Sequence, residues 1–145
     1  MANRLSLIII ALWAGALWIT GVSAYVLFDS LQDKQMAGML AGKLFTVVSY
    51  IGLASAFYLL IYRLVQFGTS ALKQAFFWAV LLMLLLVLAG HFGIQPILEG
   101  LKAQAFPADV MQSVFANRFR NWHGVASMAY VFECLLALVV VLKAR

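Results

Sequence analysis

One acidic residue, Glu133, lies in the middle of a long apolar segment near the C-terminal end of the chain. About ten residues of that segment precede it, so at about 1.5 Å per residue it would sit near mid-depth in a membrane-spanning helix. No water is available there to solvate a carboxylate, and so short a side chain cannot reach the interface. We therefore expect Glu133 to face the interior of a helix bundle. It would either hold its proton as a hydrogen-bonded structural residue or contact a proton, a cation or a solute.

Partners for Glu133 can be sought at the same depth on other helices. If consecutive helices alternate in direction, the polar side chains nearest that level are Ser49, Tyr50, Ser55, Tyr58 and His91. A tyrosine hydroxyl is a good hydrogen-bond donor to a carboxyl group. We predict that a tyrosine of the second apolar segment, with Tyr50 as the candidate, donates to Glu133.

Two histidines, His91 and His123, lie near the outer ends of apolar segments. An imidazole can bind a metal or haem iron, or relay protons. Their expected depths differ by about one and a half turns, so a b-type haem held by both is only an alternative, and an interfacial residue is the simpler interpretation of each. The polar residues assigned to the outer mouth of the bundle are His91, Gln95, Arg118, His123 and Ser127.

Motifs of soluble enzymes are missing from the sequence. It has no glycine-rich phosphate loop, no zinc spacing of cysteine and histidine, and no nucleophile elbow. The single Cys134 cannot form a disulfide within the chain, and we interpret it as a small buried residue. We expect no catalytic residue and no cofactor, and the sequence leaves open whether a metal is bound.

The composition shows which elements must position these side chains. Hydrophobic residues make up 66% of the chain and charged residues 10%, which is typical of a membrane protein. A hydrocarbon layer of about 30 Å requires about 20 mainly apolar residues per helix. Four segments qualify: 5–28, 44–62, 75–98 and 123–142. Helices joined by short loops pack as antiparallel neighbours, so the prediction is an all-α, four-helix membrane bundle that forms a single domain over residues 1–145.

The first segment also resembles a signal peptide, because Val22-Ser23-Ala24 mimics a cleavage site. Its apolar run is roughly twice the usual length, and it contains Trp13 and Trp18. We expect it to be retained as the first span.

The basic residues predict the orientation. An even number of spans puts both termini and the second loop on one side. That side carries no acidic residue, and its basic residues are Arg4, Arg63, Lys73, Lys143 and Arg145. The other side carries basic and acidic residues mixed together: Lys34, Lys43, Lys102, Arg118 and Arg120 with Asp29, Asp33, Glu99 and Asp109. Because the basic residues are denser on the first side, we predict that both termini are cytoplasmic.

Two connecting segments are informative. Gly38 and Gly42 are four residues apart, a spacing that lets helix backbones approach closely, so this stretch should continue helically into the second span. Pro96 should kink or end the third span. Beyond it, apolar residues at helical spacing predict an amphipathic interfacial helix over about 108–121, which caps or gates the bundle or simply returns the chain to the fourth span.

Four stretches together resemble a bacterial membrane family, domain of unknown function 4149, which has a eukaryotic branch of small multispan proteins. They are LWAGALWITGVSAYVLF at 12–28, AGMLAGKLF at 37–45, IQP at 94–96 and RFRNWHGVAS at 118–127. The matching positions are Trp13, Gly15, Gly21, Gly38, Gly42, Phe45, Gln95, Pro96, Phe119, His123, Gly124 and Ser127. The resemblance implies the four-helix fold and the inner membrane, with Gly15, Gly21, Gly38 and Gly42 as packing glycines. His91 stands where relatives tend to have an amide residue, which weakens a haem or metal role for it.

Three functions fit these observations. The first is small-solute, metal or proton handling, by transport or tolerance, with Glu133 inside; four helices make a thin wall, so a homo-oligomer would be expected. The second is an accessory or assembly subunit of a larger membrane complex. The third is a b-type haem membrane oxidoreductase. Nucleic acid is excluded as a partner because the chain has no basic run, and the lipid bilayer explains the charges at the helix ends.

Overall fold

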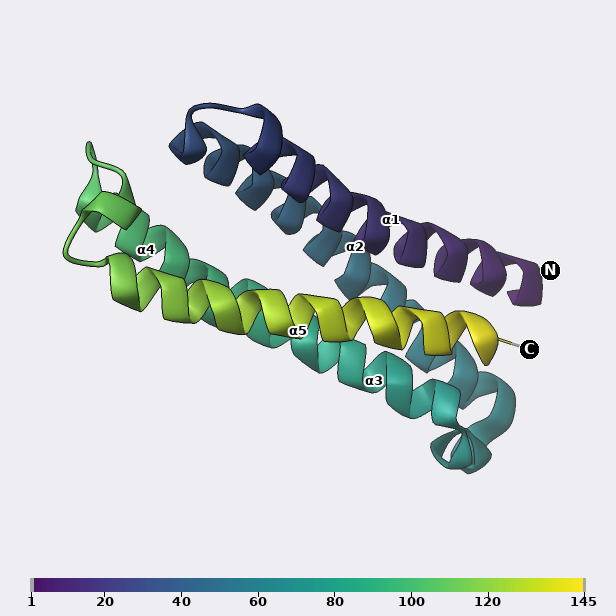
Figure 1. Cartoon of the computed structure of the whole chain (residues 1–145). Coiled ribbons are helices and arrows are strands. Elements are labelled where there is room, and N and C mark those ends of the chain that lie inside the picture. Colours follow the sequence, from purple (N-terminus) through teal and green to yellow (C-terminus); the bar gives the residue numbers. More distant parts are fainter. Residues whose placement is uncertain (1, 145) are drawn as a thin grey trace.

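The fold is entirely helical in the residues that the structure, a computed structural model, describes, which are 2–144, with side chains from residue 4 onward. Arg145, counted above among the basic residues near the termini, lies outside them. The α-helices are α1 (Ala2–Ser30), α2 (Lys34–Phe67), α3 (Ala75–Leu88), α4 (Gln95–Ala105) and α5 (Ala116–Leu142) (Figure 1). Between them lie the 3₁₀-helix η1 (Gly68–Lys73), the π-helical turn η2 (Ala89–Ile94) and the 3₁₀ turn η3 (Val110–Gln112).

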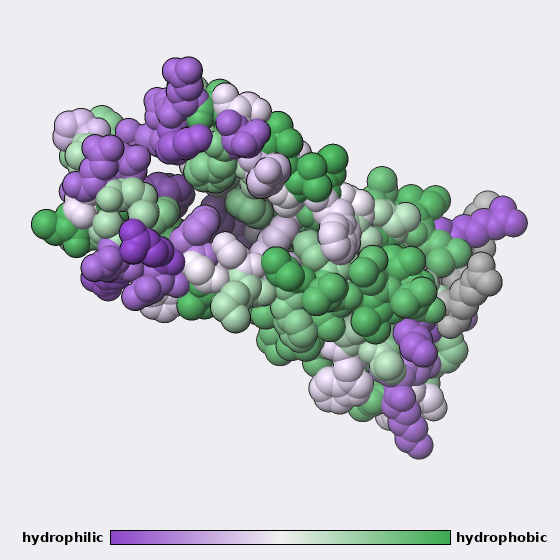
Figure 2. Space-filling view, in the orientation of Figure 1, coloured by the Kyte–Doolittle hydropathy of each residue, from purple (hydrophilic) through white to green (hydrophobic). Residues whose placement is uncertain are grey.

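Four helical stretches of this part of the chain are long and apolar enough to cross a membrane: Arg4–Ser30, Lys34–Lys73, Ala75–Ala105 and Ala116–Leu142. They confirm the four predicted spans, and each extends beyond the apolar segment that predicts it. Figure 2 shows a broad hydrophobic middle with hydrophilic side chains gathered at the two ends. This is the pattern of side chains that a lipid bilayer solvates.

The chain forms two helix hairpins, α1–α2 and α3–η2–α4–α5. Helix α1 packs on α2 and α5, and α3 packs on α2 and α5, so the four spans form a ring. The chain ends lie together at one end of the bundle, and the two hairpins diverge toward the other end (Figure 1).

The packed core lies in the half of the bundle near the termini. Its best buried side chains come from all four spans: Trp13, Leu17, Leu59, Val80, Met83 and Val140. They come from the first half of the first and third spans, as far as Leu17 at the middle of α1, and from the second half of the second and fourth spans. Antiparallel helices bring these parts of the spans to one level. The other half of the bundle contains the small residues of α2 and the divergent hairpin ends, and it is less filled.

Gly52 of α2 allows the closest approach in this core. A Cβ atom there would lie 3.1 Å from Nε1 of Trp13 and 3.2 Å from Cγ2 of Val87. Gly52 is not among the glycines that the sequence marks for packing, whereas Gly15 is. That assignment is incorrect for contacts within the chain, because a Cβ atom at Gly15 would meet nothing within 4 Å. Gly15 lies on the outward face of α1, and helix rotation cannot be determined from glycine spacing alone.

We expect Gly52→Val to destabilise the bundle by about 1–3 kcal/mol, since an added branched side chain must displace Trp13 and Val87. Gly15→Val is the matched control, because the same change there meets open space. Thermal unfolding of the two purified variants in detergent measures the difference. Equal melting temperatures would contradict the packing described here.

Pro96 distorts the third span without ending it, which is one of the two outcomes predicted for it, and the helix continues beyond the predicted limit at residue 98. The π-helical turn η2 comes directly before it, and Pro96 falls in the first turn of α4. Because the helical stretch Ala75–Ala105 is continuous, Pro96 removes one backbone hydrogen bond within it, and the π-helical turn is the local distortion beside this loss. The helix continues to Ala105.

The predicted amphipathic helix at 108–121 is not a separate element. Asp109 accepts a hydrogen bond from the N–H of Met111 at 3.0 Å, and the Ser113 hydroxyl accepts one from Phe115 at 3.2 Å. Such side-chain bonds to the backbone favour a turn over a helix. Helix α5 then begins at Ala116 and continues into the fourth span. Val110, Phe115 and Phe119 of the segment join a small cluster with Leu101 and Ala105 of α4, whereas Met111 and Val114 are exposed.

Candidate functional site

A cavity of about 1270 Å³ lies between the two hairpins in the half of the bundle away from the termini. All four spans contribute to its wall, and Figure 2 shows the molecule hollowed between the hydrophilic groups at that end. The volume exceeds the roughly 300–1,000 Å³ of common small-molecule pockets. Apolar and small side chains make up most of the lining, and its charged members are Lys34, Glu99, Lys102, Asp109 and Glu133. A cavity of this kind can hold a small molecule.

Glu133 of α5 belongs to the lining of this cavity and is only 6% exposed. Its atom Oε1 is buried and has no hydrogen-bond partner among residues 4–144. This is the inward placement that the sequence predicts. Leaving a buried polar group without a partner costs about 1–3 kcal/mol, and more for a charged one. The carboxyl group of Glu133 is therefore a buried polar group in a mostly apolar wall, and a ligand in the cavity could supply the hydrogen-bond partner that it lacks.

Tyr50 does not donate to Glu133, which corrects the sequence prediction. Its side chain is 59% exposed, and its ring packs against His91 with the ring centres 5.0 Å apart. The buried face of α2 includes Val48 and Gly52. A residue two positions from each is turned about 200° around the helix, so Tyr50 faces away from the interior.

Tyr130, one turn before Glu133, is the tyrosine that shapes the cavity. Its hydroxyl donates a hydrogen bond to the backbone carbonyl of Leu17, and its ring meets Phe45 edge-on at 5.0 Å. A Cβ atom at Gly21 would lie 3.3 Å from the Tyr130 ring, so Gly21 has the predicted packing role. These contacts tie α5 to α1 and α2 beside the carboxyl group.

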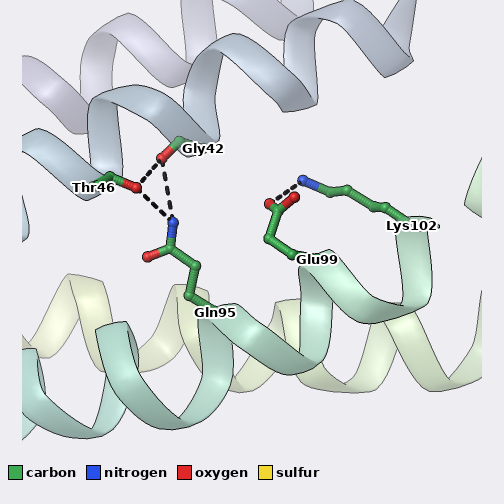
Figure 3. A network of polar contacts seen from close by, with 5 residues as sticks. All are labelled: Gly42, Thr46, Gln95, Glu99 and Lys102. Atoms are coloured by element: carbon green, nitrogen blue, oxygen red, sulfur yellow. Dashed lines mark hydrogen bonds and ion pairs between the residues drawn. The ribbon is translucent and has the colours of Figure 1, made fainter.

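A polar bridge joins α4 to α2 at the cavity wall (Figure 3). Gln95 donates through Nε2 to Oγ1 of Thr46 at 2.8 Å and to the carbonyl of Gly42 at 3.4 Å. Thr46 itself donates to the Gly42 carbonyl at 3.0 Å. On the other side of the amide, Oε1 lies 3.1 Å from Nδ1 of His91. Because an amide oxygen only accepts, His91 donates this hydrogen bond from Nδ1.

Replacing Gln95 with leucine removes this bridge. We expect Gln95→Leu to lower the free energy of unfolding by about 0.5–1.5 kcal/mol, because the half-buried side chains of Thr46 and His91 each lose one hydrogen bond. Gln104→Leu is the control, since Gln104 lies on the same helix with an exposed side chain. Chemical unfolding in detergent compares the two, and equal losses would show that the bridge contributes no stability.

The charged groups at the rim are occupied by neighbours. Lys102 pairs with Glu99 at 2.9 Å on α4, and Lys34 donates to the carbonyls of Phe28 and Leu31. Glu99 Oε1 would lie 3.4 Å from a Cβ atom at Gly42, so that glycine makes room for the α4 side chain (Figure 3). Neither lysine is paired with Glu133.

The remaining predicted mouth residues separate into two groups. His123 and Ser127 line the cavity from α5; His123 stacks on Phe119 with ring centres 5.8 Å apart, and Ser127 donates to the His123 carbonyl at 2.8 Å. Arg118 is exposed and does not line the cavity, because it lies on another face of α5. Gly38 is in ordinary contact with Phe28, at 3.7 Å. Within residues 4–144, no group of three or more His, Cys, Asp and Glu side chains could hold a metal ion.

Sequence reasoning missed three contributors to this site: Thr46, Glu99 and Tyr130. Thr46 and Glu99 are common surface residue types, and only the approach of α4 to α2 shows their role. Tyr130 had a usable signal, because residues three apart lie on one helix face and Glu133 is three positions further on.

Comparison with known proteins identifies one family. A family model described as a domain of unknown function (DUF4149) matches residues 7–107. No curated protein and no solved structure matches the chain. The matched region includes three of the four stretches that suggested the resemblance, and it covers α1 to α4. The fourth stretch, at 118–127, lies beyond it, as does Glu133.

Proposed function

Given that the chain belongs to the family described as a domain of unknown function (DUF4149), we propose that it is a membrane protein that binds a small solute in the cavity between its hairpins, for transport or tolerance. The observation that carries this proposal is the buried carboxyl group of Glu133, whose Oε1 is unpaired among residues 4–144 and which lines the cavity. A membrane helix that retains such a group is expected to use it.

The size of the cavity supports a solute over a bare proton or metal ion. A proton relay needs a narrow chain of polar groups, and a metal ion needs several ligands at short range. The cavity is broad and mostly apolar, and the described side chains provide no cluster of three metal-binding groups. A solute with an apolar body and one polar group matches such a lining.

The test of this function is a fitness profile of a deletion strain against a panel of toxic organic compounds and metal salts. We expect the deletion strain to be sensitive to a class of organic compounds, and the intact gene to restore its growth. Unchanged growth across the panel, or sensitivity to metal salts alone, would contradict it.

We also propose that the chain lies in a bacterial inner membrane with its termini in the cytoplasm, so that the cavity opens toward the opposite side. The density of basic residues near the termini supports this orientation. A reporter enzyme that is active only outside the cytoplasm should be inactive when fused after the C-terminus and active when inserted in the loop near Pro107. The reverse pattern would contradict the orientation.

A further inference from the structure

We propose that the ligand of the cavity is a lipophilic organic cation, with one positive charge and an apolar, aromatic or alkyl body. This inference rests on the proposed function and names its substrate class. It is based on the side chains around Glu133 and on the two lining lysines, Lys34 and Lys102, which are bonded to groups other than Glu133.

The charges in the cavity favour a cationic ligand. Glu133 is an acidic group 6% exposed in the cavity wall, and the lysines that line the cavity are engaged elsewhere. Lys102 is bound to Glu99, and Lys34 is bound to backbone carbonyls. Because an electrostatic attraction strengthens as the surrounding medium becomes less polar, a cation that reaches Glu133 is bound more strongly than the same cation at the rim.

The aromatic side chains of the lining also favour a cation. Trp18 and Phe45 line the cavity from α1 and α2, and Phe119 and Tyr130 line it from α5. The face of an aromatic ring is negative, so a cation within about 6 Å of a ring centre is attracted to it. These rings and the buried carboxyl group of Glu133 together form a site for an organic ammonium or phosphonium group. A small metal ion would instead need several oxygen or nitrogen ligands.

The rest of the cavity wall is apolar and favours an apolar ligand body. Aliphatic side chains such as Val48, Leu86 and Leu135 complete the lining. They gain from contact with an apolar ligand body, whereas a strongly hydrated ion or a sugar would lose its water without new hydrogen bonds. The cavity therefore discriminates both by charge and by polarity.

The test is binding of tetraphenylphosphonium to the purified full chain in lipid nanodiscs, measured by calorimetry. Two probes of similar shape accompany it: the neutral triphenylphosphine oxide and the anion tetraphenylborate. We expect the cation to bind at least ten-fold more tightly than either. We also expect Glu133→Gln to weaken cation binding at least ten-fold and to leave binding of the neutral probe unchanged. Asp29→Asn, which removes an acidic group outside the cavity, should bind the cation as the unaltered protein does.

The outcomes separate this inference from the proposed function. Equal binding of the cation and the neutral probe, or full cation binding by Glu133→Gln, would overturn the ligand class while supporting a solute cavity. Binding of the anion alone would also overturn it. Failure of all three probes, together with an unaffected deletion strain, would overturn the proposed function itself. If Glu133→Gln does not fold, Glu133→Asp serves instead, and it should keep the preference for the cation over the neutral probe.

Discussion

Replacing Glu133 with glutamine is expected to abolish the protection that the protein gives to a sensitive deletion strain. The carboxamide keeps the size of the side chain and its ability to hydrogen-bond, but it cannot carry a negative charge. Exposed ion pairs are worth about 0–1 kcal/mol, whereas breaking a buried pair costs about 3–5 kcal/mol. We therefore expect at least a ten-fold loss in the tolerated concentration of the toxic compound, measured from growth curves.

The stability of the same variant distinguishes a functional role from a structural one. Because Oε1 of Glu133 has no partner among residues 4–144, glutamine removes no hydrogen bond there, and the melting temperature should stay the same or rise. A structural carboxylic acid predicts the opposite combination, with lower stability and retained protection. Asp29→Asn is the matched control for loss of one acidic group and should protect fully. Full protection by Glu133→Gln would refute a functional role for its charge.

Filling the cavity beside Glu133 should have the second large effect. Ala129 lies one turn before Glu133 on α5 and lines the cavity. We expect Ala129→Trp to reduce ligand binding at least ten-fold, because the indole occupies the space over the carboxyl group. Calorimetric titration with tetraphenylphosphonium measures the loss.

The adjacent residue provides the control for this change. Met128 is 76% exposed and does not line the cavity, so tryptophan there faces lipid instead. We expect Met128→Trp to bind as the unaltered protein does. Equal binding by both tryptophan variants would mean that the ligand site lies elsewhere.

Features that follow from solvation were predictable from the sequence. The four spans follow from the length of hydrocarbon that a helix must cross, and the structure confirms them. The burial of Glu133 follows from the cost of placing a carboxyl group against lipid. Both depend on the composition of a single helix, so no knowledge of its neighbours is needed.

Features that depend on how helices face one another were not predictable. Tyr50 lies at a suitable depth, but the rotation of α2 turns it outward against His91. The hydrogen bond from Gln95 to Thr46 joins residues 49 positions apart, and no local sequence pattern in either segment predicts it. Gly15 and Gly52 cannot be told apart as packing positions until the helices are placed side by side.

The turn before α5 shows a local competition that periodicity does not capture. Apolar spacing predicted a helix over 108–121, but the side chains of Asp109 and Ser113 bind nearby backbone groups and favour the 3₁₀ turn η3. Val110, Phe115 and Phe119 are still buried or half-buried against α4, whereas Val114 is exposed.

The two ends of the bundle differ in packing, because one contains the hydrophobic core and the other contains the cavity. The end near the termini holds the core and the close approach at Gly52, whereas the opposite end holds the cavity and the polar bridge of Gln95. The well-packed end can hold Glu133 in place while the cavity end accepts a ligand.

The central claim is that the carboxyl group of Glu133 faces a cavity that small apolar molecules can enter. Its most direct test is labelling of membranes with a hydrophobic carbodiimide, which adds to carboxyl groups in apolar sites, followed by mass spectrometry of the peptides. We expect an adduct on Glu133 that tetraphenylphosphonium prevents and that Ala129→Trp reduces but Met128→Trp does not. An unmodified Glu133, or an adduct that neither the cation nor Ala129→Trp diminishes, would contradict it.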